Sequence, residues 1–382
     1  MTFVELFFDL VFVFAVTQVT VLTAHRLDFP GVGRSMLLFW LIWWAWTQFT
    51  WTLSPADTQH PVVRVCVLVA TGSAFVMAAS VSRAFEGDAL WFAVPYIVIR
   101  FLGMALQVLV DRERDRSELG ISMAWLTIST VGLIAVLAGA LVDPPARNWL
   151  WLVGIALDLI AAGASSRNAI WDLNPRHFSE RHGLFVIIAL GESLIVAGTA
   201  VAADDRTAEL LAAAGASLLV VCLLWWTYFG WLKEALEHGF VAAERVSVGA
   251  VARDAFSLLH FPLICGVVGF AVAVEEMMLH PDVPASDPVI ASLAAGVFLF
   301  VGSSAMAYWR VSGHVLGPRL VILMLTSIVV ILLGDAVPVW PLAAVATGLL
   351  TIAAVEGVTR QRKPENSPPT TAPSSTTAIV RR

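Results

Sequence analysis

Four acidic residues lie in apolar stretches of the chain, where a charged carboxylate is energetically unfavourable. They are Glu5, Asp9, Asp158 and Glu192. A charged side chain at the centre of a bilayer costs about 2.5–3.5 kcal/mol on insertion scales, so each should have a partner or a function. The chemistry open to such groups is proton transfer or cation binding. We therefore treat all four as candidates for coupling to a proton or a cation.

Few basic residues could neutralise these acids. Arg100, in the stretch YIVIRFLGM, is about 15 Å from either end of its predicted span, too deep for its side chain to reach the surface. Its candidate partners are Asp9, Asp158 and Glu192, and Arg64, near a span end, can neutralise at most one of them. If these spans face one interior, at least one acid must stay protonated or bind a cation. A static set of ion pairs that only locks the helices together is the alternative.

Glu5 and Asp9 are four residues apart and therefore share one face of a helix. An acid in the first turn of a helix interacts favourably with the unpaired N–H groups and the helix dipole, which is the expected role of Glu5. Asp9 is one turn deeper, and we expect it to face a polar interior lined by protein.

Glu192 lies eleven residues after Arg181, on nearly the same helical face but about 16 Å away along the axis. Because this distance excludes a direct ion pair, Glu192 needs another partner, and Ser193 and Thr199 could supply hydroxyl groups. Its role is either a structural hydrogen bond between helices or a functional carboxylate. Arg181 stays, with Arg100 and Arg64, among the candidate charge partners.

Three further residues are candidates for lining a pocket: His260, Tyr228 and Trp225. A single histidine in a membrane segment is more often hydrogen-bonded for structural reasons than a proton relay, and the two aromatic residues could simply pack. Pro262, two residues after His260, should break or kink its helix and free carbonyl groups there.

The sequence lacks the motifs of the common enzyme classes: no Walker loop, dinucleotide-binding glycine motif, HExxH or nucleophile elbow is present. Its histidines and its three cysteines do not show the paired spacing of a metal site. We therefore expect no enzymatic activity, no cofactor and no bound metal. With a net charge of −6 and no basic groove, nucleic acid is not an expected partner, and the expected partners are the lipid bilayer and an unknown small solute or ion.

The composition is that of a membrane protein, because 58% of the 382 residues are hydrophobic, only 14% are charged and the mean hydropathy is +0.81. A span needs about 20 apolar residues. By that rule we expect an all-α integral membrane protein, a polytopic bundle of about twelve spans, with the last two forming either a hairpin or one re-entrant element. The predicted spans are 3–23, 35–53, 62–84, 89–110, 119–141, 147–164, 183–203, 208–231, 254–274, 288–308, 319–335 and 338–357.

These spans suggest a division into two membrane halves of six helices, residues 1–164 and 183–358, joined by a cytoplasmic linker at 165–182. The remaining tail, 359–382, is rich in Pro, Ser and Thr, which predicts a disordered cytoplasmic extension. A tryptophan pair recurs in the second span of each half, at 43–44 and 225–226. The halves are therefore expected to be parallel repeats, with a site where they meet.

The loops between the predicted spans also indicate the orientation. One side holds 16 Lys and Arg residues and the other holds 5. Because cytoplasmic loops accumulate basic residues, both termini are expected in the cytoplasm of a bacterial cell, with the spans in the inner membrane.

Two segments give the chain a resemblance to a known family: VELFFDLVFVFAVTQ in the first span, and ERHGLFVIIALGESLIVAG at 180–198. They resemble the signature segments of the bacterial low temperature requirement protein A (LtrA) family. WWAWTQFTW, which lies between them, and WWTYF and LLHFPLICG, which come after them, are in the order that the family shows. The resemblance implies a polytopic bacterial membrane protein, without an established substrate or any catalytic residues to transfer. Relatives usually carry a polar lead before the first span, which suggests that the start codon lies upstream.

The leading functional hypothesis is a proton- or cation-coupled transporter or permease with Asp9, Glu192 and Arg100 along its path. The alternative is a non-transporting sensor or accessory protein that acts through the basic loop DRERDRSE and the tail. A cation channel is a third possibility, suggested only by the acidic first-helix segment FFDLVFVFA.

Overall fold

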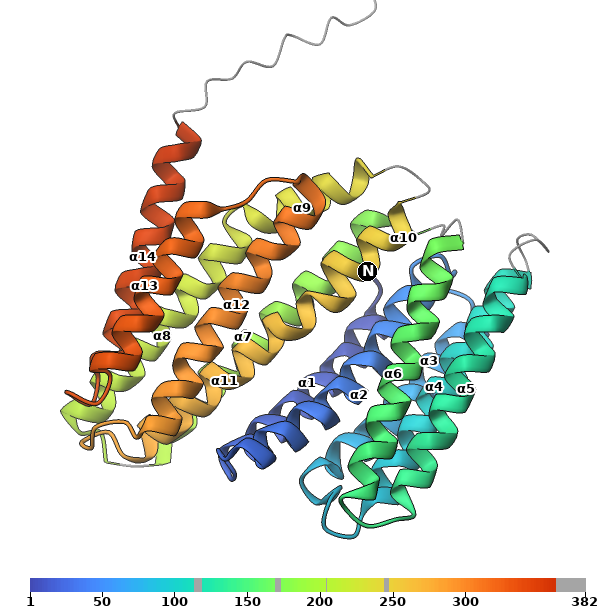
Figure 1. Ribbon diagram of the computed structural model, residues 1–382, viewed down its shortest axis with the longest axis horizontal. Coiled ribbons are helices and arrows are strands. Elements are labelled where there is room, and N and C mark those ends of the chain that lie inside the picture. The colour runs from blue at the N-terminus through green and yellow to red at the C-terminus, as the bar shows by residue number, and fades with distance from the viewer. Residues whose placement is uncertain (113–118, 169–172, 204, 244–246, 362–382) are drawn as a thin grey trace, which may run out of the picture.

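The protein is a bundle of long helices (Figure 1), seen in a computed structural model that describes residues 1–112, 119–168, 173–203, 205–243 and 247–361. Within these ranges the regular structure is entirely helical, without strands. The twelve helices of 17 or more residues are α1 (Phe3–Ala24), α2 (Phe29–Leu53), α3 (Pro61–Ala79), α4 (Ala89–Arg112), α5 (Leu119–Ala140), α6 (Ala146–Asn168), α7 (Pro175–Ala203), α8 (Ala208–Phe229), α11 (His260–Leu279), α12 (Asp287–Ser312), α13 (Gly317–Leu333) and α14 (Trp340–Gln361). Shorter elements are η1 (Val81–Arg83), α9 (Leu232–Val241), α10 (Val248–Val251) and the π-helical η2 (Ala252–Leu258).

The predicted fold class is confirmed: this is a multi-pass helical membrane protein. Eight helical segments within the described ranges are long and apolar enough to cross a membrane. The other four predicted spans, now α2, α5, α6 and α13, are also helices over the expected residues. The last two predicted spans, α13 and α14, are separate helices that pack against each other as a hairpin.

The same helix neighbours recur in α1–α6 and in α7–α14. In the first set, α1 packs on α2 and α3, the chain then continues through neighbours α3–α4, α4–α5 and α5–α6, and α2 touches α4 and α6. The second set repeats every one of these pairs if α7, α8, α11, α12, α13 and α14 take the places of α1 to α6. This correspondence favours the predicted parallel repeat.

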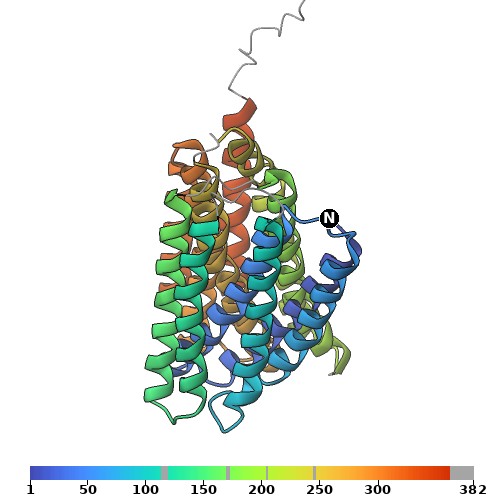
Figure 2. The ribbon, with the colours of Figure 1, turned by 90° about the vertical axis from the view of Figure 1, so that its right-hand side faces the viewer.

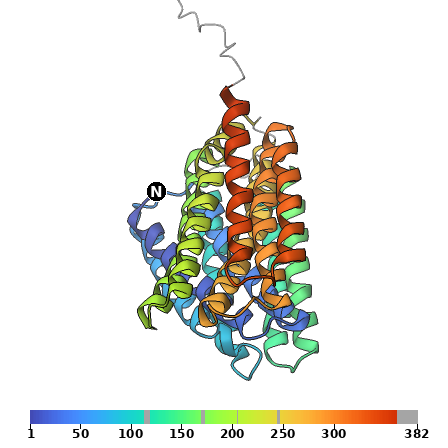
Figure 3. The ribbon, with the colours of Figure 1, turned by 90° about the vertical axis from the view of Figure 1, so that its left-hand side faces the viewer.

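The two sets of helices meet along α1 and α2 on one side and α7 and α11 on the other. The hairpins α5–α6 and α13–α14 form the two outer edges of the bundle (Figures 2 and 3). The start of α1 and the end of α14 lie at the same end of the bundle, which we call the terminal end (Figure 1). We call the other end, where α1 and α7 finish, the far end.

The segment predicted as a linker, 165–182, is largely helix instead. α6 continues to Asn168, and α7 begins at Pro175, whose ring is preorganised for the first helical turn. Asn174 supports this start, because its side-chain oxygen accepts the His177 N–H at 3.2 Å. Arg181 is fully buried within this early part of α7. The first turns of α7 therefore place the guanidinium group of Arg181 inside the bundle. Of the predicted tail, residues 359–361 belong to α14 and the rest lies outside the described residues.

The helix break predicted at Pro262 is present as the π-helical segment η2. Proline has no N–H to donate, and just before it the hydrogen-bond register widens, since the Leu259 N–H donates to the Asp254 carbonyl at 3.1 Å. The ring Nδ1 of His260 bonds the carbonyl of Ala255 at 2.9 Å. The side chain of His260 thus satisfies a backbone group near the irregular turn.

Candidate functional site

Arg100 of α4 is paired with Asp158 of α6. The guanidinium donates two hydrogen bonds to the carboxylate, from Nη1 to Oδ2 at 2.8 Å and from Nη2 to Oδ1 at 2.7 Å, and a third to the Tyr96 hydroxyl at 3.0 Å. Both charged side chains are almost completely buried. This two-point geometry is among the strongest that an Arg and a carboxylate can form. Arg100 therefore neutralises Asp158 and is not shared with the other acids.

A second buried ion pair joins Asp9 of α1 to Arg181 of α7. Asp9 Oδ1 accepts Arg181 Nη2 at 2.6 Å and the indole N–H of Trp46 at 2.7 Å. Arg181 Nη1 also reaches the carbonyl of Phe49 at 3.4 Å. All three polar side chains are buried. Asp9 does face a protein-lined interior, and a cation and an indole from two other helices satisfy it.

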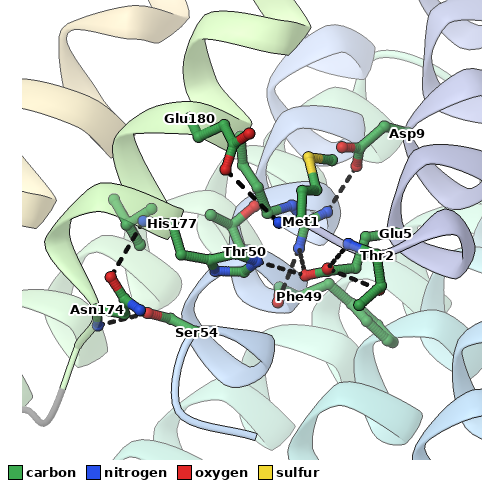
Figure 4. Close-up of polar contacts among 12 residues, drawn as sticks. Met1, Thr2, Glu5, Asp9, Phe49, Thr50, Ser54, Asn174, His177 and Glu180 are labelled. Carbon is green, nitrogen blue, oxygen red and sulfur yellow. Dashed lines mark hydrogen bonds and ion pairs between the residues drawn. The ribbon is translucent and has the colours of Figure 1, made fainter. Parts of the chain in front are cut away.

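Glu5 is held at the terminal end by local and long-range contacts (Figure 4). One carboxylate oxygen accepts both the backbone N–H and the hydroxyl of Thr2 at 2.8 Å, as in a capping box. The other lies 2.9 Å from His177 Nε2 and 3.9 Å from Arg181 Nη1. Glu5 thus caps α1, as the spacing suggested, and also belongs to the charge cluster of Asp9 and Arg181.

Glu192 differs from the other deep acids, because no cation lies within ion-pair distance of it in the described parts of the chain. Its side chain is 4% exposed, and Oε2 accepts the hydroxyl of Thr17 at 2.6 Å across the α1–α7 interface. The neighbouring hydroxyl of Ser193 is buried without a hydrogen-bond partner. A carboxyl group in these surroundings is stable when it is protonated or holds a cation.

A second acid, Glu275, lies four residues before the end of α11. It is half-buried, and its Oε2 is enclosed without a hydrogen-bond partner. Glu275 is thus a second partly buried acid for which no Arg or Lys lies within ion-pair distance among the described residues. His25 is exposed just beyond the end of α1.

Sequence reasoning missed Thr17 and Glu275. It assigned the hydroxyl partner of Glu192 to Ser193 or Thr199, but Thr199 is exposed and bonds the carbonyls of Ile195 and Val196 in its own helix. A threonine in an apolar helix gives no hydropathy signal. The adjacent Glu275 and Glu276 at the end of an apolar span were a usable signal.

Two expected contributions were wrong. Arg64 does not neutralise a deep acid: it is exposed near the start of α3 and donates to the side chain of Gln59. Trp225 does not face the interior, since it is 42% exposed on the outside of α8 and stacks on Phe229. Both positions are at helix faces that point away from the bundle, and hydropathy alone does not fix the rotation of a helix.

His260 and Tyr228 meet in the core. The Tyr228 hydroxyl lies 2.7 Å from His260 Nε2, and both side chains are 1% exposed. His182 packs edge-to-face on His260 with ring centroids 5.2 Å apart. Each histidine also bonds a backbone carbonyl of its own helical segment through Nδ1. The Tyr228–His260 hydrogen bond and the contact between the two imidazole rings join α7, α8 and α11.

Comparison with known proteins agrees with the segments recognised in the sequence. The model of the bacterial low temperature requirement A protein (LtrA) family matches residues 1–355. The chain belongs to this family. A curated relative, an uncharacterized protein of Rhizobium meliloti (strain 1021), is 30% identical to this LtrA protein over 329 residues, which cover 82% of this chain and 78% of the relative. No solved structure matches.

The two segments that carry the LtrA resemblance are in contact in the structure. The first lies in α1 and the second in α7, and these helices pack against each other. The contacts between them include the pair of Asp9 with Arg181 and the hydrogen bond of Thr17 with Glu192. The LtrA signature therefore corresponds to one polar interface, with ion pairs at its terminal end and an unpaired acid deeper in.

Proposed function

We propose that this LtrA protein is a secondary transporter in which Glu192 takes up and releases the coupling proton or cation. One observation carries the proposal: Glu192 is the deep acid with only a hydroxyl partner, whereas Asp9 and Asp158 each pair with an arginine. A charge that is not committed to an ion pair can change its state while the fold persists. We assign the route between Glu192 and the far end to two groups: Glu275, near the end of α11, and His25, exposed just after α1.

The excess of basic residues in alternate loops supports an orientation with the terminal end in the cytoplasm of the bacterial cell and the far end on the outer side of the inner membrane. In that orientation Glu192 exchanges its ion with the outer face. The ion pairs of Asp9 and Arg181 form the cytoplasmic barrier beneath it. Alternating access then requires that α1 and α7 separate at the terminal end, a movement that would open the cluster around Arg181.

The proposal is tested by reconstituting the full chain on a solid-supported membrane and recording the electrical current during a jump in pH or in Na⁺ concentration. A coupled transporter without its substrate should give a brief current as the ion binds, and the Glu192→Gln variant should lose it. Glu86→Gln is the matched control, because Glu86 is an exposed acid at the far end with only a long contact to Arg26, at 3.9 Å. Its current should equal that of the wild type.

The same recording separates the alternatives. A sustained current in the wild type would show a channel and would overturn coupling at Glu192. The absence of any transient, or a transient that survives Glu192→Gln, would also overturn it. A loss of membrane abundance in Glu192→Gln equal to the loss of current would show that the acid is structural.

A further inference from the structure

A groove lies at the far end of the bundle, beside the first turns of α2 and α6. These two helices form most of its wall, and Phe261 of α11 closes it from the other set of helices. We call it the far-end groove and define it by Arg34, Trp40, Asn148, Leu152 and Phe261. Its volume of about 490 Å³ is in the range of roughly 300–1,000 Å³ that is usual for ligand sites.

The far-end groove opens on the outside of the bundle, close to the level of the lipid headgroups. Leu152 in its wall is exposed, although it lies within an apolar membrane helix. Trp91 and Trp149 are also exposed, two and three residues after the starts of α4 and α6 at the same end. Exposed tryptophans near the ends of spans mark the boundary between headgroups and acyl chains. A ligand that enters the groove from the side therefore comes from the bilayer.

Arg34 is a half-buried cation in this groove, and no acid neutralises it. Its guanidinium carbon lies 5.6 Å from the ring centroid of Phe85, and within the described parts of the chain no ion pair or hydrogen bond holds it. Three other arginines at the far end do have polar partners. Arg26 and Arg83 face acids at 3.9 Å and 3.0 Å, and Arg147 donates to a backbone carbonyl at 3.0 Å. The N–H donors of Arg34 thus remain available to a negatively charged ligand.

The wall changes from polar to apolar with depth. By the rise of an α-helix, Arg34 and Asn148 lie within about 8 Å of the starts of α2 and α6. Trp40 and Ile155 lie about 13–17 Å from those starts. Phe261 packs on Trp40 there, with ring centroids 4.6 Å apart. One end of the groove therefore suits an anionic group that accepts hydrogen bonds, and the other end suits a hydrocarbon chain.

Gly33 lines the groove next to Arg34 in the sequence. A Cβ added at this position would meet no atom within 4 Å, so close helix packing does not require the glycine. Glycine within a helix is also less favourable than alanine. Space for a ligand is a reason for a glycine here, and a larger side chain at residue 33 would take up that space.

We propose that the far-end groove binds one anionic phospholipid. Arg34 donates to its phosphate group, which the planar guanidinium can contact with two hydrogen bonds, and the Asn148 amide offers a further N–H group. An acyl chain packs along Leu152 and Ile155. No acidic side chain lines the groove among the described residues, so the positive charge of a zwitterionic headgroup would have no partner. The inference does not depend on ion coupling at Glu192, and binding is measured without transport.

Native mass spectrometry of the full chain in detergent with added lipid measures the binding constant of the first lipid. The probes are phosphatidylglycerol and phosphatidylcholine with identical oleoyl chains, and inorganic phosphate is the competitor. Phosphatidylglycerol should bind roughly fivefold more tightly than phosphatidylcholine, because one arginine beside an anionic headgroup contributes a factor of that size. Inorganic phosphate should not displace it, since phosphate has no chain to pack on the apolar wall. Equal binding of the two lipids, or displacement by phosphate, would overturn the proposal.

Two variants test the charge and the space of the groove separately. Arg34→Gln should weaken phosphatidylglycerol binding roughly tenfold, as expected for lost hydrogen bonds to a charged group. Arg206→Gln is its control, because Arg206 is exposed just before α8 at the same end, and it should bind as the wild type does. Gly33→Leu fills the groove without a clash and should weaken the binding of both lipids. Gly72→Leu, at an equally uncrowded glycine of α3 outside the groove, should weaken neither. Unchanged binding in Arg34→Gln or in Gly33→Leu would place the lipid elsewhere on the bundle and contradict the proposed site.

Discussion

The acids at the two ends of the α1–α7 interface differ in the partners that they have. At the terminal end, Asp9 and Glu5 share Arg181, His177, Trp46 and the cap at Thr2. Deeper along the same two helices, Glu192 has a single hydroxyl partner, that of Thr17. One helix pair thus holds a charge cluster with its partners in place and a single acid without a cation.

This difference distinguishes acids that stabilise the fold from an acid that can change its charge state. A buried carboxylate with an arginine and an indole is fixed in its charged form, and removal of one partner leaves a charge that nothing compensates. A carboxyl group with only a hydroxyl donor can change its charge state at small structural cost. We therefore expect mutations at the terminal end to affect stability, and mutations near Glu192 to affect activity.

The largest effect is expected from Arg181→Met, which leaves Asp9 buried without a cation. The free energy of unfolding should fall by about 3–5 kcal/mol, measured by titration with sodium dodecyl sulfate in mixed micelles. The double variant Asp9→Leu/Arg181→Met should recover most of this loss, because no isolated charge remains. Arg64→Met is the control, since Arg64 is exposed, and it should change the stability little. A loss below 1 kcal/mol in Arg181→Met would mean that the pair contributes little to the fold.

Trp46→Phe should have an intermediate effect. It keeps the ring packing but removes the indole donor to Asp9, a hydrogen bond to a charged group worth about 1.5–3 kcal/mol. The same detergent titration measures it, with Trp91→Phe as the control because Trp91 is 65% exposed on α4. If the losses in free energy of unfolding from Trp46→Phe and Arg181→Met added up fully in the double variant, the two donors to Asp9 would act independently of each other.

Thr17→Val should have a smaller effect on stability, about 1 kcal/mol, because it removes one hydrogen bond to Glu192. Its main effect should be on the carboxyl group, whose protonated C=O band in the infrared spectrum should move when the hydroxyl donor is lost. Thr20→Val is the control on α1, since the Thr20 hydroxyl bonds the carbonyl of Val16 in its own helix. An unchanged band in Thr17→Val would contradict the contact between Thr17 and Glu192.

The contrast between the charge cluster and the single acid was only partly predictable from the sequence. Hydropathy located the helices, because a span is about 20 residues of apolar chain, and the depth of Arg100 showed that it needed a partner. The sequence did not show that the partner is Asp158, or that Arg181 takes Asp9. Those pairings depend on how each helix is rotated, and in α7 also on a helix start at Pro175 that hydropathy placed eight residues too late.

The smallest change in stability is expected from Glu192→Gln. The amide is nearly the same size as the carboxyl group, its oxygen can still accept the Thr17 hydroxyl, and no arginine loses its partner. The free energy of unfolding should therefore stay within about 0.5 kcal/mol of the wild type, as for substitutions that break no network. Asp158→Asn is the matched control, because it is the same chemical change in a paired acid, and it should cost about 3–5 kcal/mol by leaving Arg100 without its counter-charge. If Glu192→Gln destabilised the protein as much as Asp158→Asn does, Glu192 would be a structural acid, and the difference between the two ends of the interface would lose its functional meaning.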